Sequence, residues 1–152
     1  MQLHESAVLD VPLPRVWAAL NDPNVLKLCV PGCQEINVVG PNIYSAKAVI
    51  KIGFISSRFD NVLVKKSVAE DGQSLNFEMS GEDTNKIGSF KQKLQIKLSD
   101  STSPSSNSAK TTIELNADVE LKGKFATLGK RIVEWKAKNV MEEFVQNLRK
   151  LS

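Results

Sequence analysis

The sequence predicts an α+β domain in which a curved, seven-stranded antiparallel sheet wraps around a long C-terminal helix. Segments that alternate apolar and polar residues fill most of the chain from residue 34 to 121, as is typical of half-buried strands. Residues 125–151 instead carry apolar residues at helical spacing. The 152 residues fit one domain spanning 1–152, which is long enough to fold without a disulfide or a metal.

The N-terminal part is expected to form one strand and two short helices. Pro14 suits the first turn of a helix, where a missing N–H costs nothing. Asp22 and Pro23 end that helix and start the next, and Gly32 marks a turn. The expected elements are a strand over residues 3–11 and helices over 15–20 and 24–29.

Six further strands are expected to complete an antiparallel sheet. Asp71-Gly72 is a hairpin signal, and residues 99–108 form a polar loop between the last two strands. The outward face of the sixth expected strand is basic and that of the seventh is acidic, which favours their pairing. The six strands are expected over residues 34–39, 43–52, 58–68, 74–80, 90–98 and 111–121.

The C-terminal helix is expected over residues 125–151, with its apolar residues in two groups rotated by about 150°. Either the helix kinks, or its two halves pack against different things. We favour the second alternative, in which one half packs on the sheet and the other closes a cavity or meets a partner. The groups are Phe125, Leu128, Ile132 and Trp135, and Ala137, Val140, Met141, Phe144, Leu148 and Leu151.

Small inward residues predict a ligand-sized space between sheet and helix. Only 6% of the residues are aromatic, and several inward positions are alanine, so a cavity is expected to stay partly unfilled. The residues expected to line it are Ala46, Ala48, Ile50, Leu75, Phe77, Leu94 and Leu115 from the sheet, with Phe125, Leu128 and Ile132 from the helix.

The positive charge is concentrated in the last segment. The chain has 20 Lys and Arg against 17 Asp and Glu, a net charge of +3, and residues 124–152 alone carry seven bases and three acids. A solvated helix face is the simpler interpretation. The alternative is a docking face for an anionic membrane or a protein, formed by Lys130, Arg131 and Lys138. No dense basic run with interleaved aromatics suggests nucleic-acid binding.

The titratable residues suggest neither a catalytic set nor a metal site. Zinc needs four ligands, whereas Cys29, Cys33 and the single His4 offer three, so both cysteines are read as small buried residues and no cofactor is expected. His4 is expected to point outward. Glu5 shares the inward parity of its strand and is expected at an exposed strand end. With no secretory signal and no apolar run long enough to span a bilayer, a cytoplasmic location is expected.

Four stretches resemble the family of G-type carbon monoxide dehydrogenase subunits (CoxG), which belongs to the START-like (SRPBCC, polyketide cyclase and lipid-transport) helix-grip superfamily. They are residues 11–23 (VPLPRVWAALNDP), 29–33 (CVPGC), 51–59 at KIG and RF, and 123–131 (GKFATLGKR). The resemblance implies a helix-grip fold with a hydrophobic cavity. It also implies an accessory role beside a molybdenum-type carbon monoxide dehydrogenase or related oxidoreductase, by membrane recruitment or by binding a lipid or quinone. Within it, Pro31 and Gly32 form a turn near the cavity mouth, and Trp17 packs.

The favoured function is therefore the non-enzymatic binding of a lipid or quinone. Two alternatives stay open. One is an assembly or docking module that uses the basic helix face to contact oxidoreductase subunits or, peripherally, the inner face of a membrane. The other is a cyclase- or dehydratase-like enzyme, which would need polar groups converging in the cavity.

Overall fold

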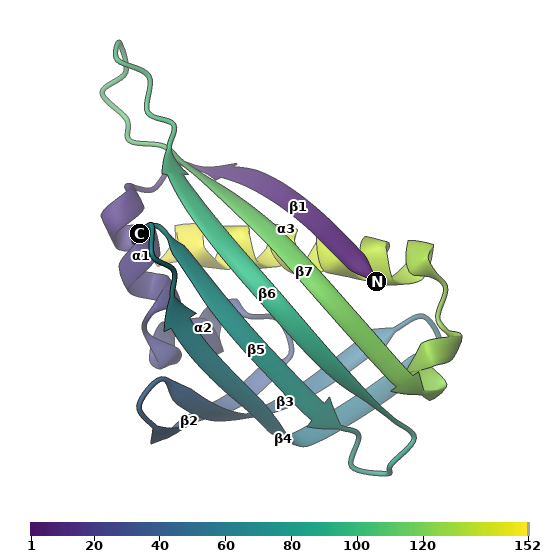
Figure 1. Cartoon of the computed structure of the whole chain (residues 1–152). Coiled ribbons are helices and arrows are strands. Elements are labelled where there is room, and N and C mark those ends of the chain that lie inside the picture. Colours follow the sequence, from purple (N-terminus) through teal and green to yellow (C-terminus); the bar gives the residue numbers. More distant parts are fainter. Residues whose placement is uncertain (152) are drawn as a thin grey trace.

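Residues 1–151 are described by a computed structural model, in which one sheet curves around one face of the last helix (Figure 1). The elements in chain order are β1 (Gln2–Leu9), α1 (Leu13–Leu20), α2 (Pro23–Cys29), β2 (Cys33–Gly40), β3 (Ile43–Ile52), β4 (Ile55–Val68), β5 (Ser74–Glu82), β6 (Gly88–Asp100), β7 (Thr111–Gly123), the 3-10 helix η1 (Lys124–Thr127) and α3 (Lys130–Lys150).

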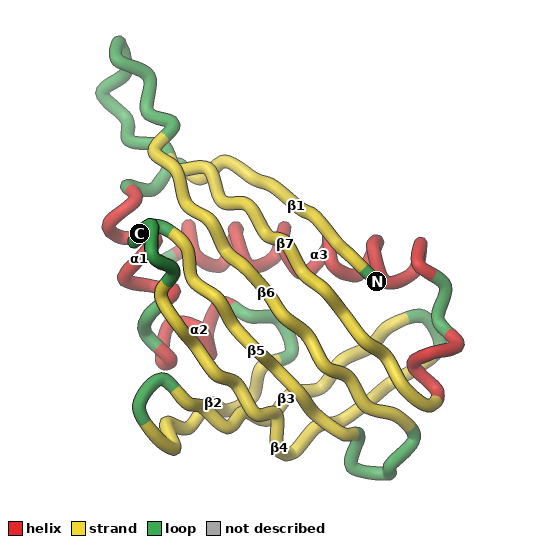
Figure 2. Tube along the Cα trace, in the orientation of Figure 1, coloured by secondary structure: helices red, strands yellow, loops and turns green. Residues whose placement is uncertain are grey.

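The seven strands form a single sheet in the order β1-β7-β6-β5-β4-β3-β2, and every neighbouring pair is antiparallel. Only β1 leaves sequence order, because it pairs with β7. Figures 1 and 2 show α3 crossing behind the sheet, while β3 and β4 curl beneath it. The predicted fold class, a curved antiparallel sheet with two short helices and a long C-terminal helix, is confirmed.

Two element starts differ from the prediction, and both differences have a local cause. The β3–β4 turn has only two residues, Gly53 and Phe54, because Ile52 pairs with Ile55. Gly53 takes a φ of 58°, which glycine adopts without strain, so β4 begins three residues earlier than expected. At the C-terminal end, η1 reverses the chain after β7, and α3 therefore begins at Lys130 instead of residue 125.

The expectation that α3 has two differently packed halves is wrong. The helix is one continuous element of 21 residues, and its buried residues Val133, Met141, Val145 and Leu148 lie within about 120° of one another on one face. Phe125 and Leu128 precede the helix and pack separately. Ile132 and Trp135 are 41% and 67% exposed, so the first predicted apolar group forms no buried half.

The core lies between the sheet and α3 in two clusters. The larger cluster, here the packed end, surrounds the C-terminal half of α3 and α1, and it is aliphatic. Its buried members include Leu9, Leu20, Leu75, Leu98, Ile113, Met141 and Leu148. The smaller cluster lies around β3, β4 and η1, where Phe59 meets the rings of Phe90 edge-on and of Phe125 in a stack, at centroid distances of 5.3 and 5.9 Å.

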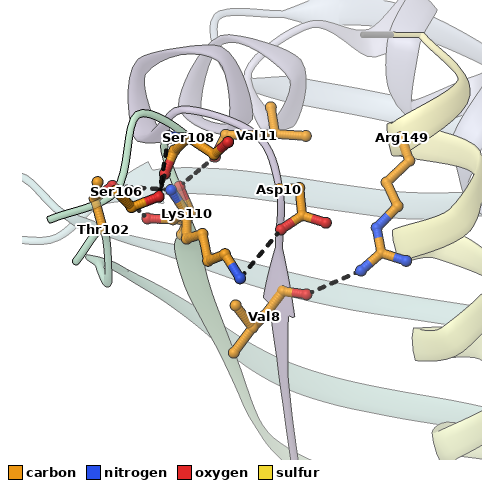
Figure 3. A network of polar contacts seen from close by, with 9 residues as sticks. Val8, Asp10, Val11, Thr102, Ser106, Ser108, Lys110 and Arg149 are labelled. Atoms are coloured by element: carbon orange, nitrogen blue, oxygen red, sulfur yellow. Dashed lines mark hydrogen bonds and ion pairs between the residues drawn. The ribbon is translucent and has the colours of Figure 1, made fainter.

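Polar contacts fix the packed end to the last turns of α3. The Arg149 guanidinium donates to the Val8 carbonyl oxygen at 3.2 Å, and Lys110 forms an ion pair with Asp10 at 3.7 Å (Figure 3). The Thr111 hydroxyl, which is fully buried, donates to the Val11 carbonyl oxygen at 2.6 Å. The loop between β6 and β7 projects from this end, away from the body of the domain (Figure 1).

Candidate ligand-binding site

Alternation along the strands places a defined set of side chains toward α3. The register aligns Val64, Met79, Gln92 and Val119 in one row across β4 to β7. The next row toward the packed end contains Phe77, Leu94 and Ala117. Both rows face α3, because Phe77 packs in the cluster that contains the buried helix residues.

Several of these helix-facing residues are only half-buried. A side chain that faces a covering helix becomes fully buried when the two layers fill the space between them. Here the aliphatic side chains are closed off toward the packed end and stay partly accessible toward the N-terminal half of α3. The half-buried ones are Leu3, Val64, Met79, Leu94, Leu115, Ala117, Leu121 and Leu128. We call this region the open end.

A cavity of about 820 Å³ adjoins the open end. This volume lies within the range of roughly 300–1,000 Å³ that is usual for small-molecule sites. Its helix-side wall, as we name it here, consists of Met79, Gln92, Val119, Leu121, Ala126 and Leu128. Its other lining residues are Met1 and residues on the opposite face of β4 to β7, namely Leu63, Lys65, Glu78, Ser80, Lys91, Lys93, Asp118 and Glu120.

The position of the N-terminus explains why the cavity reaches both faces of the sheet. Pairing between β1 and β7 ends at Gln2 and Asp118, and β7 continues beyond the N-terminus (Figure 1). The Met1 amino group closes the end of the pairing by donating to the Val119 carbonyl oxygen at 3.0 Å, and it lies 3.7 Å from the Asp118 carboxylate. Beyond this point the edge of β7 is open.

Gln92 is the polar residue of the helix-side wall. Its register neighbours on either side are Met79 and Val119, and among residues 1–151 we find no hydrogen bond made by its side chain. An amide in an apolar wall can donate to one ligand oxygen and accept from one hydroxyl. Gln92 was not among the residues predicted from the sequence, although it shares the inward parity of Phe90 and Leu94 and could have been found on that ground.

The ten residues predicted to bind a ligand lie in different places. Leu128 lines the cavity, and Leu94 and Leu115 are half-buried on the same helix-facing surface. Leu75, Phe77, Ala46 and Phe125 are buried in the two core clusters. Ala48 and Ile50 on β3 are half-buried, and Ile132 points outward from α3. The structure therefore brings only some of them to one place.

Lys66 is a second polar residue on the helix-facing surface. It is aligned with Phe77, and its ammonium donates to the Asn21 side-chain oxygen at 2.9 Å and lies 5.8 Å from the centre of the Tyr44 ring. Asn21 in turn donates to the Trp17 carbonyl oxygen at 2.9 Å. These contacts attach the end of α1 to β4, so Lys66 holds the short helices against the sheet.

The other titratable candidates lie outside the cavity. His4 is exposed as predicted, with its Nδ1 2.6 Å from the Asn116 side-chain oxygen. Glu5 is in the middle of β1 and half-buried, so its predicted place at a strand end is wrong. Cys29 is buried, Cys33 is half-buried, and burial raises the pKa of both thiols. Among residues 1–151, no group of three or more potential ligands could hold a metal ion.

The predicted docking residues Lys130, Arg131 and Lys138 are all exposed on α3. Lys130 forms an ion pair of 3.8 Å with Glu134 one turn along the helix. Pro31 and Gly32 form the turn between α2 and β2, where the Gly32 carbonyl oxygen accepts from the Val49 N–H at 2.9 Å. Trp17 packs against the larger core cluster, as the family resemblance implied. Within residues 1–151, no helix is both long and apolar enough to cross a membrane.

Solved structures with low sequence identity share this fold. A conserved protein from Geobacillus kaustophilus is 22% identical with a TM-score of 0.83, and the match covers 99% of this chain and 93% of that one. A START superfamily protein from Mycobacterium smegmatis is 13% identical with a TM-score of 0.69, covering 98% and 94%. The Zhui aromatase/cyclase from Streptomyces sp. R1128 is 8% identical with a TM-score of 0.61, covering 99% and 92%.

The family follows from a match to a family profile. The comparison with curated proteins found no match. The profile of CoxG, the G-type subunit of carbon monoxide dehydrogenase, matches residues 8–151, which is nearly the whole chain and includes the four stretches that carry the resemblance. With a START-like helix-grip fold and this match, the chain belongs to the CoxG family of carbon monoxide dehydrogenase subunits.

Proposed function

We propose that the protein binds an apolar small molecule, a lipid or a quinone, at the open end between α3 and strands β5 to β7, without transforming it. The observation that carries this proposal is the row of half-buried apolar residues that faces α3 beside a cavity of about 820 Å³. Burying an apolar ligand there contributes roughly 25 cal/mol per Å² of apolar surface removed from water. Binding strength would therefore come mainly from shape and apolar area.

Gln92 would set the orientation of the ligand. A quinone carbonyl or a lipid ester offers an oxygen that the Gln92 amide can bind by donating a hydrogen bond. The helix-side wall supplies this neutral amide among apolar side chains, which suits recognition of an uncharged polar group. General acid–base chemistry would instead need titratable groups converging on the ligand, so this wall supports binding over catalysis.

The family suggests the setting. Membership of the CoxG family supports an accessory role beside a molybdenum-type carbon monoxide dehydrogenase or a related oxidoreductase. We place the protein in the cytoplasm, where its bound quinone or lipid would serve such an enzyme. Contact with the oxidoreductase subunits belongs to this proposal and is tested by co-purification from the native host.

Ligand extraction tests the proposal directly. The full chain is purified from its native host, extracted with organic solvent, and the extract is analysed by mass spectrometry. We expect a lipid or quinone at close to one molecule per chain. Leu94→Trp should fill the helix-facing space and lower the bound amount at least fivefold, whereas Val38→Trp on exposed β2 should not change it. An empty wild-type extract, or equal loss in both variants, would overturn the proposal.

A further inference from the structure

An aromatic and basic surface lies where the β3–β4 turn meets the start of α3. Phe54 occupies the two-residue turn and is 109% exposed, so its ring projects from the protein with no covering contact. A Cβ built on the adjacent Gly53 would lie 3.6 Å from Leu128 and 3.7 Å from Ile132. The turn therefore touches the first turn of α3, although the two segments are far apart in sequence.

The exposed face of α3 continues this surface. Trp135 lies one turn after Ile132 on the same side of the helix, about 60° around the axis, and is 67% exposed. Large apolar side chains at single exposed positions are ordinary. Three of them at one junction, Phe54, Ile132 and Trp135, form a protruding apolar group that packing against the core does not explain. We call this group, together with the bases around it, the tip surface.

The charge around the tip surface has one sign. The two segments that meet there, residues 49–58 and 121–133, contain six bases and no acid. Three of these bases form ion pairs with neighbouring acids, namely Arg58, Lys122 and Lys130. For Lys51, Lys124 and Arg131 we find no ion pair among residues 1–151. The unpaired charge beside the exposed aromatics is therefore entirely positive.

We propose that the tip surface docks the protein onto an anionic lipid bilayer, with Phe54 and Trp135 inserted at the level of the headgroups. Trp and Phe side chains partition into this interfacial region, and nearby lysine and arginine side chains are attracted to anionic headgroups. A bilayer also needs no complementary shape, which suits aromatics that project singly from a turn and a helix. These residues form no concave apolar groove of the kind that receives a partner helix.

The tip surface is continuous with the candidate ligand site. Leu128, which touches the β3–β4 turn, also lines the cavity together with Ala126. Docking by Phe54 and Trp135 would therefore hold this edge of the cavity against the bilayer, where lipids and quinones reside. This consequence rests on the proposed function, whereas the docking itself does not.

Vesicle binding tests the docking. The full chain is sedimented with vesicles of phosphatidylcholine alone and of phosphatidylcholine with phosphatidylglycerol. We expect binding to the anionic vesicles that weakens with added salt, and little binding to the neutral ones. The double variant Phe54→Ser with Trp135→Ser should lower the partition coefficient about tenfold. Val38→Ser with Val39→Ser removes comparably exposed apolar groups from β2 and should leave it unchanged.

A charge pair separates attraction by the tip surface from the net charge of the protein. Lys51→Glu with Arg131→Glu should lower binding to the anionic vesicles about tenfold. Lys93→Glu with Lys97→Glu changes the net charge equally on exposed positions of β6 and should have a much smaller effect. Circular dichroism and thermal unfolding of each variant verify that it folds.

Three results would overturn the docking proposal. They are no wild-type binding to anionic vesicles, equal losses in the tip and control variants, and a salt-sensitive complex with a protein that depends on Phe54 and Trp135 while vesicles are ignored. The outcomes are independent of the ligand test. An empty wild-type extract with intact vesicle binding would reject the proposed ligand and keep the docking, and the reverse pattern would reject the docking alone.

Discussion

The two ends of this domain are built from the same sheet and the same helix, yet they are filled differently. At the packed end, aliphatic side chains from β5, β6, β7 and α3 close around one another and are almost fully buried. At the open end, side chains with the same strand parity stay half-buried beside a cavity. One amphipathic pattern therefore supplies both a stabilising core and a place for a ligand. Matched variants at the two ends separate these two roles.

The largest expected difference is between two leucines on the same face of β6. Leu98 is fully buried at the packed end, and Leu94 is half-buried toward the open end. Leu98→Ala should lower the free energy of unfolding by about 3 kcal/mol, because it leaves a cavity in a closed core. Leu94→Ala should cost about 1 kcal/mol, since its site is already partly open. Urea denaturation measures both values, and equal costs would contradict the distinction between the ends.

The second comparison uses two positions on α3. Met141 is 3% exposed and faces the packed end, whereas Trp135 is exposed on the opposite side of the helix. Met141→Ala should lower the free energy of unfolding by about 2 kcal/mol, and Trp135→Ala should change it by less than about 0.5 kcal/mol.

Thermal unfolding of the two variants decides this comparison. A large destabilisation by Trp135→Ala would mean that its ring packs in the folded protein, and it would remove Trp135 from the tip surface. Nearly equal melting temperatures for both variants would contradict the single buried face of α3.

Periodicity predicted the strands and their inward residues well, because a half-buried sheet imposes a strict alternation. It predicted α3 less well. Phe125 and Ile132 have helical spacing, but the chain reverses through η1 between them, and spacing alone does not reveal such a reversal. The exposure of Trp135 was missed for a related reason. A large apolar residue is normally assigned to a core, and only the tertiary packing shows that the buried face of the helix lies elsewhere.

The candidate site could be predicted only in part. The sequence indicated a space between sheet and helix from its small inward residues, and it placed Leu94, Leu115 and Leu128 beside that space. It could not show that the cavity adjoins the edge of β7, because that edge is open where β1 begins, and the point depends on strand register. Gln92 was accessible to the same parity argument that identified Leu94, and it was overlooked because amides are usually assigned to the solvent face.

A smaller effect is expected where α1 is attached to the sheet. Asn21 accepts a hydrogen bond from Lys66 and donates one to the Trp17 carbonyl oxygen. Asn21→Ala removes both and should lower the free energy of unfolding by about 1 kcal/mol. Lys66→Met keeps the aliphatic stem and removes only the first bond, so it should cost less. If Lys66→Met is the more damaging variant in denaturant unfolding, the ammonium has a further partner.

The smallest effect is confined to acid and concerns the polar contacts that support the open end. Asp83 is buried in the loop between β5 and β6, where it accepts from the Ser57 hydroxyl at 2.6 Å and from the backbone N–H of Asn85 at 2.7 Å. These hydrogen bonds, Ser57 first, hold the pKa of the Asp83 carboxyl below its ordinary value. A carboxyl whose pKa is lower in the folded state stabilises the fold above its unfolded pKa, near pH 4.

The stabilisation by Asp83 is therefore complete at neutral pH and is lost as the pH falls through the lowered pKa. Melting temperatures between about pH 2 and pH 7 should show a smaller acid-induced decrease for Asp83→Asn than for the wild type, together with a lower value at neutral pH. Ser57→Ala should shift the midpoint of the wild-type decrease upward, because the largest cause of the lowered pKa is gone. An Asp83→Asn profile parallel to the wild type would mean that other carboxyls, such as Asp71, whose pKa is also lowered, control the acid response.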